Sequence, residues 1–210
     1  MVLRFVFVTH MIAKLIHLRQ VIFHPEYIEK IIPASARIMS DEEFHDLYNA
    51  LWIGKPTTLI NLFCEAKLGR FHTHLKLTPY GYSQGPSSSA ELKSAILDIL
   101  NGLKWLHDRG FVHRDVRWPN VLRKANGKFM LIDLELAGKE GPVHFRCHAW
   151  PELEDEQYLK KMDLIMLGDM ILRYSFLDSA EGVFFRGGDF LGKLSDGWTA
   201  EEAMRHEWLS

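Results

Sequence analysis

The sequence predicts an α+β fold with two lobes, a small mixed lobe at the N-terminus and a mostly helical lobe after it. Three observations indicate this division. Strand-like and helical patterns are mixed over residues 1–80, a run rich in Gly, Pro and Ser occupies residues 78–89, and helical periodicity dominates the remainder. With 210 residues, 47% of them hydrophobic, the chain can bury one substantial core.

The first lobe is expected to hold strands and one capped helix. The stretches "RFVFVT" at 4–9 and "TTLINLF" at 57–63 are strand-like. In "SDEEFHDLYNALW" at 40–52, a serine precedes a glutamate by three positions, which is the spacing of a helix capping box. Polar and apolar residues alternate in "FHTHLKL" at 71–77, as they do in a half-buried strand.

The second lobe is expected to be built from helices. "YLKKMDLIMLGDMILRY" at 158–174 is apolar on most sides, which indicates a buried helix. Thr199 is suited to cap a terminal amphipathic helix over 199–209. The clearest helix has apolar residues at helical spacing and a glycine that ends it: Leu92, Ile96, Ile99, Leu103, Leu106 and Gly110.

Composition excludes several classes of function. A net charge of -2, from 25 basic and 27 acidic residues, gives no basic surface for nucleic acid or an anionic membrane, so neither is expected as a partner. Cys64 and Cys147 show no paired spacing, and no Asn-x-Ser/Thr acceptor occurs, which favours an intracellular location in cytoplasm or nucleus. The apolar N-terminus is interrupted by charge and is shorter than the ~20 residues of a transmembrane helix.

The segment "NVLRKANGKFMLID" at 120–133 predicts a β-hairpin. The pair Asn126-Gly127 is typical of a two-residue type I′ turn, and with that turn Asn120 faces Asp133. Directly opposed residues have Cβ atoms ~5 Å apart. An amide oxygen and a carboxylate are ligands that Mg²⁺ accepts, so Asn120 and Asp133 are predicted to hold magnesium.

A second carboxylate and a cation precede this hairpin. Asp115 follows His113 and Arg114 in a turn, and Arg117 lies between Asp115 and the hairpin. Phosphoryl transfer needs a carboxylate to orient the attacking hydroxyl, oxygen ligands for magnesium and fixed positive charge for the phosphate. We therefore expect Asp115 to act as the base and Arg117 to neutralise the transferred phosphate.

These motifs resemble those of the protein kinase superfamily. Residues 113–120 are similar to the catalytic loop H-R-D-x-x-x-x-N, and Asp133 stands where the family has the Asp of D-F-G. The resemblance covers about residues 57–209, and "HRDVRWPN" is similar to divergent kinase-like domains of fungi and oomycetes, including crinkler-type effectors. Further matches are Pro151 and Glu152 to the A-P-E block and Asp163 and Gly168 to the family's buried helix.

The resemblance implies one protein kinase-like domain over residues 1–210, with a reduced N-terminal lobe at 1–80 and a C-terminal lobe at 81–210. It implies ATP and Mg²⁺ as cofactors, Asn120 and Asp133 as the residues that bind them, and a protein serine or threonine as acceptor. Asp163 is expected to serve as a hydrogen-bond acceptor for the catalytic loop.

Three departures from the family pattern stand out. No G-x-G-x-x-G precedes the linker, and the candidate for the phosphate-pairing lysine is Lys14, with its acidic partner open among Glu26, Glu29 and Glu43. Glu135 replaces the glycine of D-F-G. The arginine that would pair with the A-P-E glutamate, here Glu152, is missing from "SDGWTA", so Glu152 either lacks a partner or uses Arg205.

Alternatives to a protein kinase also stay open. A pseudokinase or truncated fragment that acts as a binding module would explain the missing glycine loop. A small-molecule kinase stays open because "HFRCHAW" at 144–150 lacks the threonine and tyrosine that protein kinases usually show before A-P-E. The whole segment 133–152 contains no Ser, Thr or Tyr. In that segment we expect Glu135 or Glu140 to pair with Arg114 or Arg146, ordering it without phosphorylation.

Overall fold

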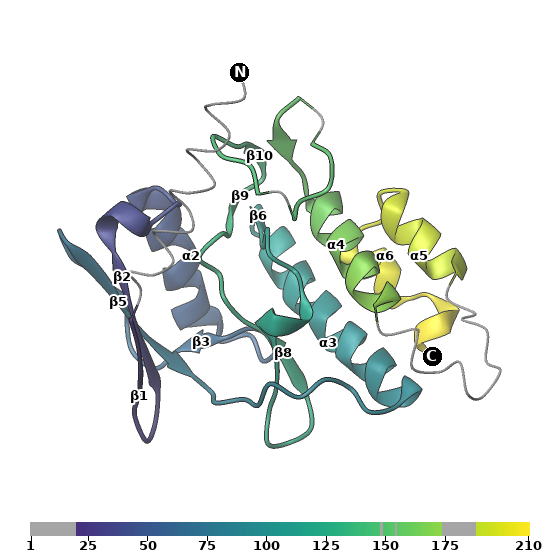
Figure 1. The fold of residues 1–210 in the computed structure, drawn as a ribbon, viewed down its shortest axis with the longest axis horizontal. Coiled ribbons are helices and arrows are strands. Elements are labelled where there is room, and N and C mark those ends of the chain that lie inside the picture. The colour runs from purple at the N-terminus through teal and green to yellow at the C-terminus, as the bar shows by residue number, and fades with distance from the viewer. Residues whose placement is uncertain (1–19, 148, 154, 174–187) are drawn as a thin grey trace.

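A five-stranded antiparallel sheet and a group of helices make up the fold (Figure 1). The computed structural model describes residues 20–147, 149–153, 155–173 and 188–210. The strand order is β1-β2-β5-β3, and β4 also pairs with β5. The strands are β1 (Gln20–Phe23), β2 (Ile28–Pro33), β3 (Asn61–Leu62), β4 (Lys67–Leu68) and β5 (His72–Thr78). The predicted strand at 4–9 and Lys14 lie outside the described residues.

Helix α2 (Asp41–Gly54) lies between this sheet and the helical region (Figure 1). It begins as the sequence predicts, because the Ser40 side chain accepts the Glu43 backbone N–H and the Glu43 carboxylate accepts the Ser40 backbone N–H. The helix ends at Lys55, whose φ of 42° is left-handed. Its buried face consists of Phe44, Leu47, Tyr48 and Leu51.

The helical region contains α3 (Ser89–His107), α4 (Lys160–Leu172), α5 (Gly188–Ser195) and α6 (Ala200–Met204). The long helix α3 and the buried helix α4 are confirmed. The terminal helix starts at the predicted cap Thr199 but ends at Met204, earlier than expected. The His206 side chain accepts the N–H of Trp208 and starts a separate 3₁₀ turn (Glu207–Leu209), so the pattern breaks into two short pieces.

The hairpin is formed by β7 (Val121–Arg123) and β8 (Phe129–Leu131), but its register differs from the prediction. Val121 faces Leu131, and the Asn120 carbonyl accepts the N–H of Ile132 at 2.8 Å. Asn120 therefore pairs with Ile132 and not with Asp133. The predicted direct opposition of the two magnesium ligands is wrong by one residue.

The turn explains this shift of register. The Lys124 N–H donates to the Lys128 carbonyl at 2.8 Å, so three residues, 125–127, form the loop. Gly127 has a φ of +81°, whereas Asn126 is not left-handed and its side chain accepts the Lys128 N–H. Three-residue hairpin loops of this kind place a glycine alone in the left-handed region. The Asn-Gly pair marks the turn correctly but not its length.

Two short strand pairs flank the loop that precedes the hairpin. They are β6 (Phe111–Val112) with β9 (Gly138–Lys139), and β10 (Gly141–Pro142) with β11 (Gln157–Tyr158). Besides the turn at Glu207–Leu209, the described residues include the 3₁₀ turns η1 (Ala34–Ala36) and η2 (Trp118–Asn120). In the described part of the chain, no helix has both the length and the apolarity needed to cross a bilayer.

Candidate active site

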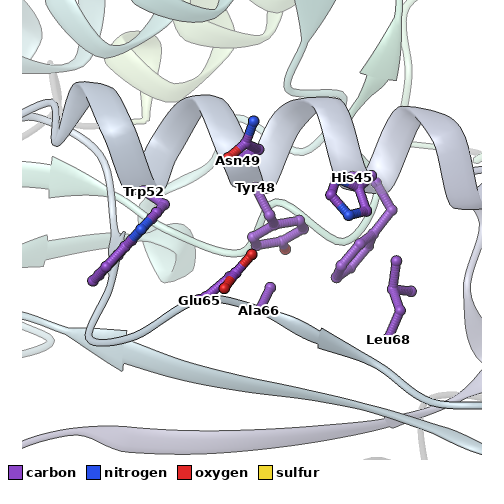
Figure 2. Close-up of a pocket in the computed structure, with 8 residues that line it drawn as sticks. His45, Tyr48, Asn49, Trp52, Glu65, Ala66 and Leu68 are labelled. Carbon is purple, nitrogen blue, oxygen red and sulfur yellow. The ribbon is translucent and has the colours of Figure 1, made fainter.

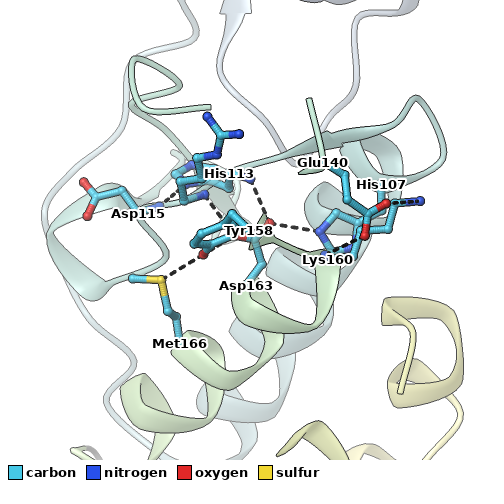
Figure 3. A network of polar contacts seen from close by, with 9 residues as sticks. His107, His113, Asp115, Glu140, Tyr158, Lys160, Asp163 and Met166 are labelled. Atoms are coloured by element: carbon cyan, nitrogen blue, oxygen red, sulfur yellow. Dashed lines mark hydrogen bonds and ion pairs between the residues drawn. The ribbon is translucent and has the colours of Figure 1, made fainter. Parts of the chain in front are cut away.

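The loop between β6 and β7, residues 113–120, is held in place by hydrogen bonds to helix α4. The fully buried Asp163 carboxylate accepts the backbone N–H groups of His113 and Arg114 at 2.7 and 2.9 Å, as well as contacts from His107 and the Tyr158 hydroxyl (Figure 3). Burial opposes the carboxylate's charge, but the hydrogen bond and charge of His107 hold the pKa of Asp163 below its ordinary value. The role expected for Asp163, a hydrogen-bond acceptor for this loop, agrees with these contacts.

His113 connects the loop to the segment after β8 that contains Asp133. Its Nδ1 accepts the Asp115 N–H at 3.2 Å, and its Nε2 lies 3.0 Å from the Ile132 carbonyl. A ring that accepts at Nδ1 carries its proton on Nε2, which can donate to that carbonyl. Burial lowers the pKa of His113. A neutral imidazole therefore joins the two segments.

Three predicted site residues meet around one carboxylate. Asp115 accepts the Asn120 side-chain N–H at 2.6 Å on one oxygen and lies 3.0 Å from the Arg117 Nε on the other. The same Asn120 nitrogen lies 2.9 Å from the Asp115 carbonyl. Asp115 is 8% exposed, whereas the Arg117 side chain is 55% exposed. The Asp115 carboxylate is thus held in one orientation near the protein surface. The long, largely exposed side chain of Arg117 lies beside it.

The remaining predicted residue, Asp133, lies against a lysine that sequence reasoning missed. The Lys30 Nζ on β2 is 2.9 Å from Asp133 Oδ1 and also pairs with Glu135. Asp133 has a φ of 65°, a conformation in which strain is tolerated chiefly at functional sites. Burial opposes the charge of Lys30, but Asp133 and Glu135 outweigh it and raise its pKa above the ordinary value.

Among the residues that the structure describes, Lys30 is the lysine that lies at the site, whereas the predicted candidate Lys14 lies outside those residues. A signal was present in "IEKIIP", because a lysine within a run of isoleucines must find a buried partner. Of the three open candidates for the acidic partner of the phosphate-pairing lysine, Glu26 is exposed and the other two contact other groups. Glu29 lies 3.0 Å from His74, and Glu43 accepts the backbone N–H groups of Ser40 and Lys139.

The segment after Asp133 is held by contacts that differ from those expected. Arg114 donates to the Lys139 carbonyl at 2.7 Å, while Glu140 accepts the Lys160 backbone N–H at 3.0 Å. The expected pairing of Glu135 or Glu140 with Arg114 or Arg146 is therefore wrong. The Tyr158 ring and the Arg114 guanidinium lie close together, 5.7 Å from charge centre to ring centroid.

Glu152 does not use Arg205 as a partner. Arg205 pairs with Glu201 one helical turn earlier, and Glu152 is exposed. Trp150, next to the A-P-E-like block, is buried and donates its indole N–H to the Arg114 carbonyl at 2.6 Å. The block is thus fixed to the loop through an aromatic residue.

A separate hollow of about 270 Å³ lies between α2 and β4 (Figure 2). Its walls are mostly aromatic and apolar, and none of the predicted site residues borders it. The residues around it are Phe44, His45, Tyr48, Asn49, Trp52, Glu65, Ala66 and Leu68. The candidate active site is therefore the cluster around Asp115 and Asp133.

The fold and this cluster define the class of protein. The family model described as "Protein kinase domain" matches residues 42–171. The chain belongs to the protein kinase domain family, and its α+β fold, with a sheet-rich N-terminal part and helices after it, is the fold of that family.

Several curated proteins are similar to this chain. Mitogen-activated protein kinase kinase kinase 1 of Arabidopsis thaliana is 56% identical over 115 residues, which cover 47% of this chain and 19% of the relative. Serine/threonine-protein kinase PEPKR2 of the same plant is 26% identical over 164 residues, which cover 60% of this chain and 34% of the relative. Crinkler effector protein 8 of Phytophthora infestans is 26% identical over 110 residues, which cover 52% of this chain and 17% of the relative. The chain spans at most about a third of the length of these relatives.

Proposed function

We propose that this chain is an ATP- and magnesium-dependent phosphotransferase that acts on serine or threonine hydroxyls of a protein. The observation that carries the proposal is the convergence of two clusters. Lys30 and Asp133 pair at one side, and Asp115, Arg117 and Asn120 contact one another at the other, joined by His113. The domain assignment, one kinase domain over 1–210 with lobes at 1–80 and 81–210, is part of the proposal.

Asp115 is the proposed base. Its carboxylate is oriented by Asn120 and has no need to reorganise before it accepts the proton of an incoming hydroxyl. Arg117 is long and largely exposed, so it can leave Asp115 and contact a phosphate when one is bound. Proton acceptance and charge neutralisation then come from neighbouring side chains of the same loop.

Asn120 and Asp133 are the proposed metal ligands. The Asn120 side-chain nitrogen is directed at Asp115, and within the described residues its amide oxygen accepts no hydrogen bond. An amide oxygen and a carboxylate are hard ligands that suit Mg²⁺, which is commonly bound through one or two protein oxygens plus substrate phosphates. The donor set fits. A bound magnesium ion would neutralise charge that develops on the transferred phosphate.

Lys30 is the proposed phosphate-binding cation. It lies between two carboxylates and its raised pKa keeps it charged, so it can bind an anionic nucleotide without first gaining a proton. The names of two relatives, Mitogen-activated protein kinase kinase kinase 1 and Serine/threonine-protein kinase PEPKR2, include "protein kinase", which supports a protein as acceptor.

A binding module without catalysis is the rival proposal, favoured by the absence of G-x-G-x-x-G from the sequence. Thermal unfolding with and without millimolar ATP and Mg²⁺ separates the two. We expect the melting temperature to rise for the wild type and for Asp115→Ala, and not for Lys30→Met, because only a bound ligand stabilises the folded state.

Phosphate transfer to a generic acceptor such as casein then tests Asp115. Asp115→Ala should reduce the rate by ~10² to 10⁴ while nucleotide binding is retained. Absence of any thermal shift in the wild type would favour the binding module. An unchanged rate in Asp115→Ala would show that another group is the base.

A further inference from the structure

Lys30 has two carboxylate partners, and both come from one short segment. Its Nζ contacts Asp133 at 2.9 Å and pairs with Glu135 two residues later. The side chain of Glu135 is 5% exposed, and that of Asp133 is 30% exposed. Glu135 is therefore the buried partner of the lysine, and Asp133 is the one that faces the site.

Helix α2, which packs between the sheet and the loop, contributes no carboxylate to Lys30. Its buried face is apolar except for Tyr48. Its four acidic residues lie elsewhere: Asp41 pairs with Arg37, Glu43 accepts from Ser40 and from the Lys139 backbone, Asp46 lies 3.6 Å from Lys139 Nζ, and Glu42 is exposed.

The surroundings of Glu135 strengthen its pairing with Lys30. A small cavity beside it is lined largely by apolar groups, among them Ile32 and Phe44, and also by Arg37, whose guanidinium pairs with Asp41. A carboxylate and an ammonium buried in such surroundings each lose hydration, so removal of Glu135 leaves the buried ammonium with Asp133 as its remaining carboxylate partner. The side-chain exposure of Lys30 is only 16%.

We propose that Glu135 is the positioning residue of Lys30 and retains the ammonium at the site while Asp133 binds metal. The proposed function supplies the role of Asp133 in this inference. Because Asp133 and Glu135 belong to the same segment, Lys30 would be anchored without any carboxylate from α2. The pairing of Lys30 with Glu135 can be tested in the full chain without nucleotide or metal.

The test measures the chemical reactivity of Lys30. The full chain is labelled with acetic anhydride between pH 7 and 10, and modification of Lys30 is quantified by mass spectrometry. In Glu135→Gln, one carboxylate is lost and burial favours the neutral amine, so labelling at pH 8 should rise about tenfold. Glu135→Asp, which keeps the charge at a greater distance, should raise it about threefold.

Glu42→Gln is the matched control, since it removes an exposed carboxylate of α2 and should label like the wild type. The proposal would be overturned if Lys30 in Glu135→Gln were labelled to the same extent as in the wild type while its labelling rose in Asp133→Asn. That result would mean that Asp133 alone holds the lysine. A rise in Glu43→Gln equal to that in Glu135→Gln would also overturn it, in favour of an α2 carboxylate. Thermal unfolding checks that each variant folds, and if Glu135→Gln does not fold, wild-type labelling in Glu135→Asp overturns the proposal.

A second measurement separates this inference from the proposed function. With Mg²⁺ and ATP, Glu135→Gln should lower kcat at least tenfold while KM for ATP changes less, and Glu135→Asp should restore part of the rate. If the wild type neither binds nor uses ATP, the proposed function fails, and the labelling result alone still decides whether Glu135 holds Lys30.

Discussion

The guanidinium of Arg114 donates to the backbone carbonyl of Lys139 at 2.7 Å. The opposite side of that backbone is also held, because the Lys139 N–H donates to the Glu43 carboxylate at 3.1 Å. Lys139, in the segment after Asp133, therefore joins the loop that contains Arg114 to helix α2. No modified residue takes part in either bond.

The first prediction is that this segment is ordered without phosphorylation. Residues 133–152 contain no Ser, Thr or Tyr, and Lys139 is held from both sides. The Lys139 amide should exchange slowly with deuterium in the wild type, and phosphatase treatment should leave its exchange rate unchanged. Glu43→Gln should accelerate exchange by about tenfold, since a charge-assisted hydrogen bond of ~1.5 kcal/mol or more is weakened. Faster exchange after phosphatase treatment alone would contradict the prediction.

Gly138 should be required for the position of Arg114. A Cβ at residue 138 would lie 2.5 Å from Arg114 Nη1. The guanidinium is buried and bonded to Lys139, so it cannot simply move away. Gly138→Ala should reduce the free energy of unfolding by ~1 to 3 kcal/mol, as overpacking does, measured by urea denaturation.

Gly192 in helix α5 is the matched control for that substitution. A Cβ there meets no atom within 4 Å, and the residue is exposed. Gly192→Ala should be neutral or stabilise the chain by up to ~1 kcal/mol, because alanine favours helix over glycine. Equal effects of the two substitutions would show that contact with Arg114 is not the cause.

Asp163 should be among the most important single residues for stability. Asp163→Ala leaves the buried N–H groups of His113 and Arg114 without their acceptor, and a loss of ~3 to 5 kcal/mol is expected. Urea unfolding measures it. Asp169→Ala, an exposed aspartate on the same helix α4, should change stability by less than ~0.5 kcal/mol. A loss below ~1 kcal/mol in Asp163→Ala would show that the loop finds other acceptors.

Stability should fall with acidification because of His113. Burial lowers the pKa of this imidazole in the folded state, whereas the unfolded chain binds a proton near the ordinary value of about 6.5. The unfolded state therefore holds more protons below about pH 6.5, and the free energy of unfolding decreases as pH falls, by at most ~1.4 kcal/mol per pH unit for one proton. Urea unfolding from pH 7.5 to 5 should show the slope, and His113→Phe should reduce it. An identical slope in the variant would assign the effect to other groups.

Local sequence determined much of this protein. Capping boxes at Ser40 and Thr199 start their helices as predicted, because a cap depends on residues three positions apart. The loop from His113 to Asn120 brings Asp115, Arg117 and Asn120 together within eight positions, so their mutual contacts follow from one short motif. The kinase family itself could be inferred from these residues.

Contacts between distant segments were decided by the tertiary structure. Lys30 and Asp133 lie 103 positions apart, and only the pairing of β2 with β1 and β5 brings that lysine to the site. The hairpin register depends on whether two or three residues form the turn, and the pair Asn126-Gly127 is compatible with both turn lengths. From the sequence, Glu135 is only the residue that replaces the glycine of D-F-G. Its pairing with Lys30 becomes evident only in the folded chain, where its side chain is buried. Burial and long-range register set these pairings, and neither is encoded in the local spacing of residues.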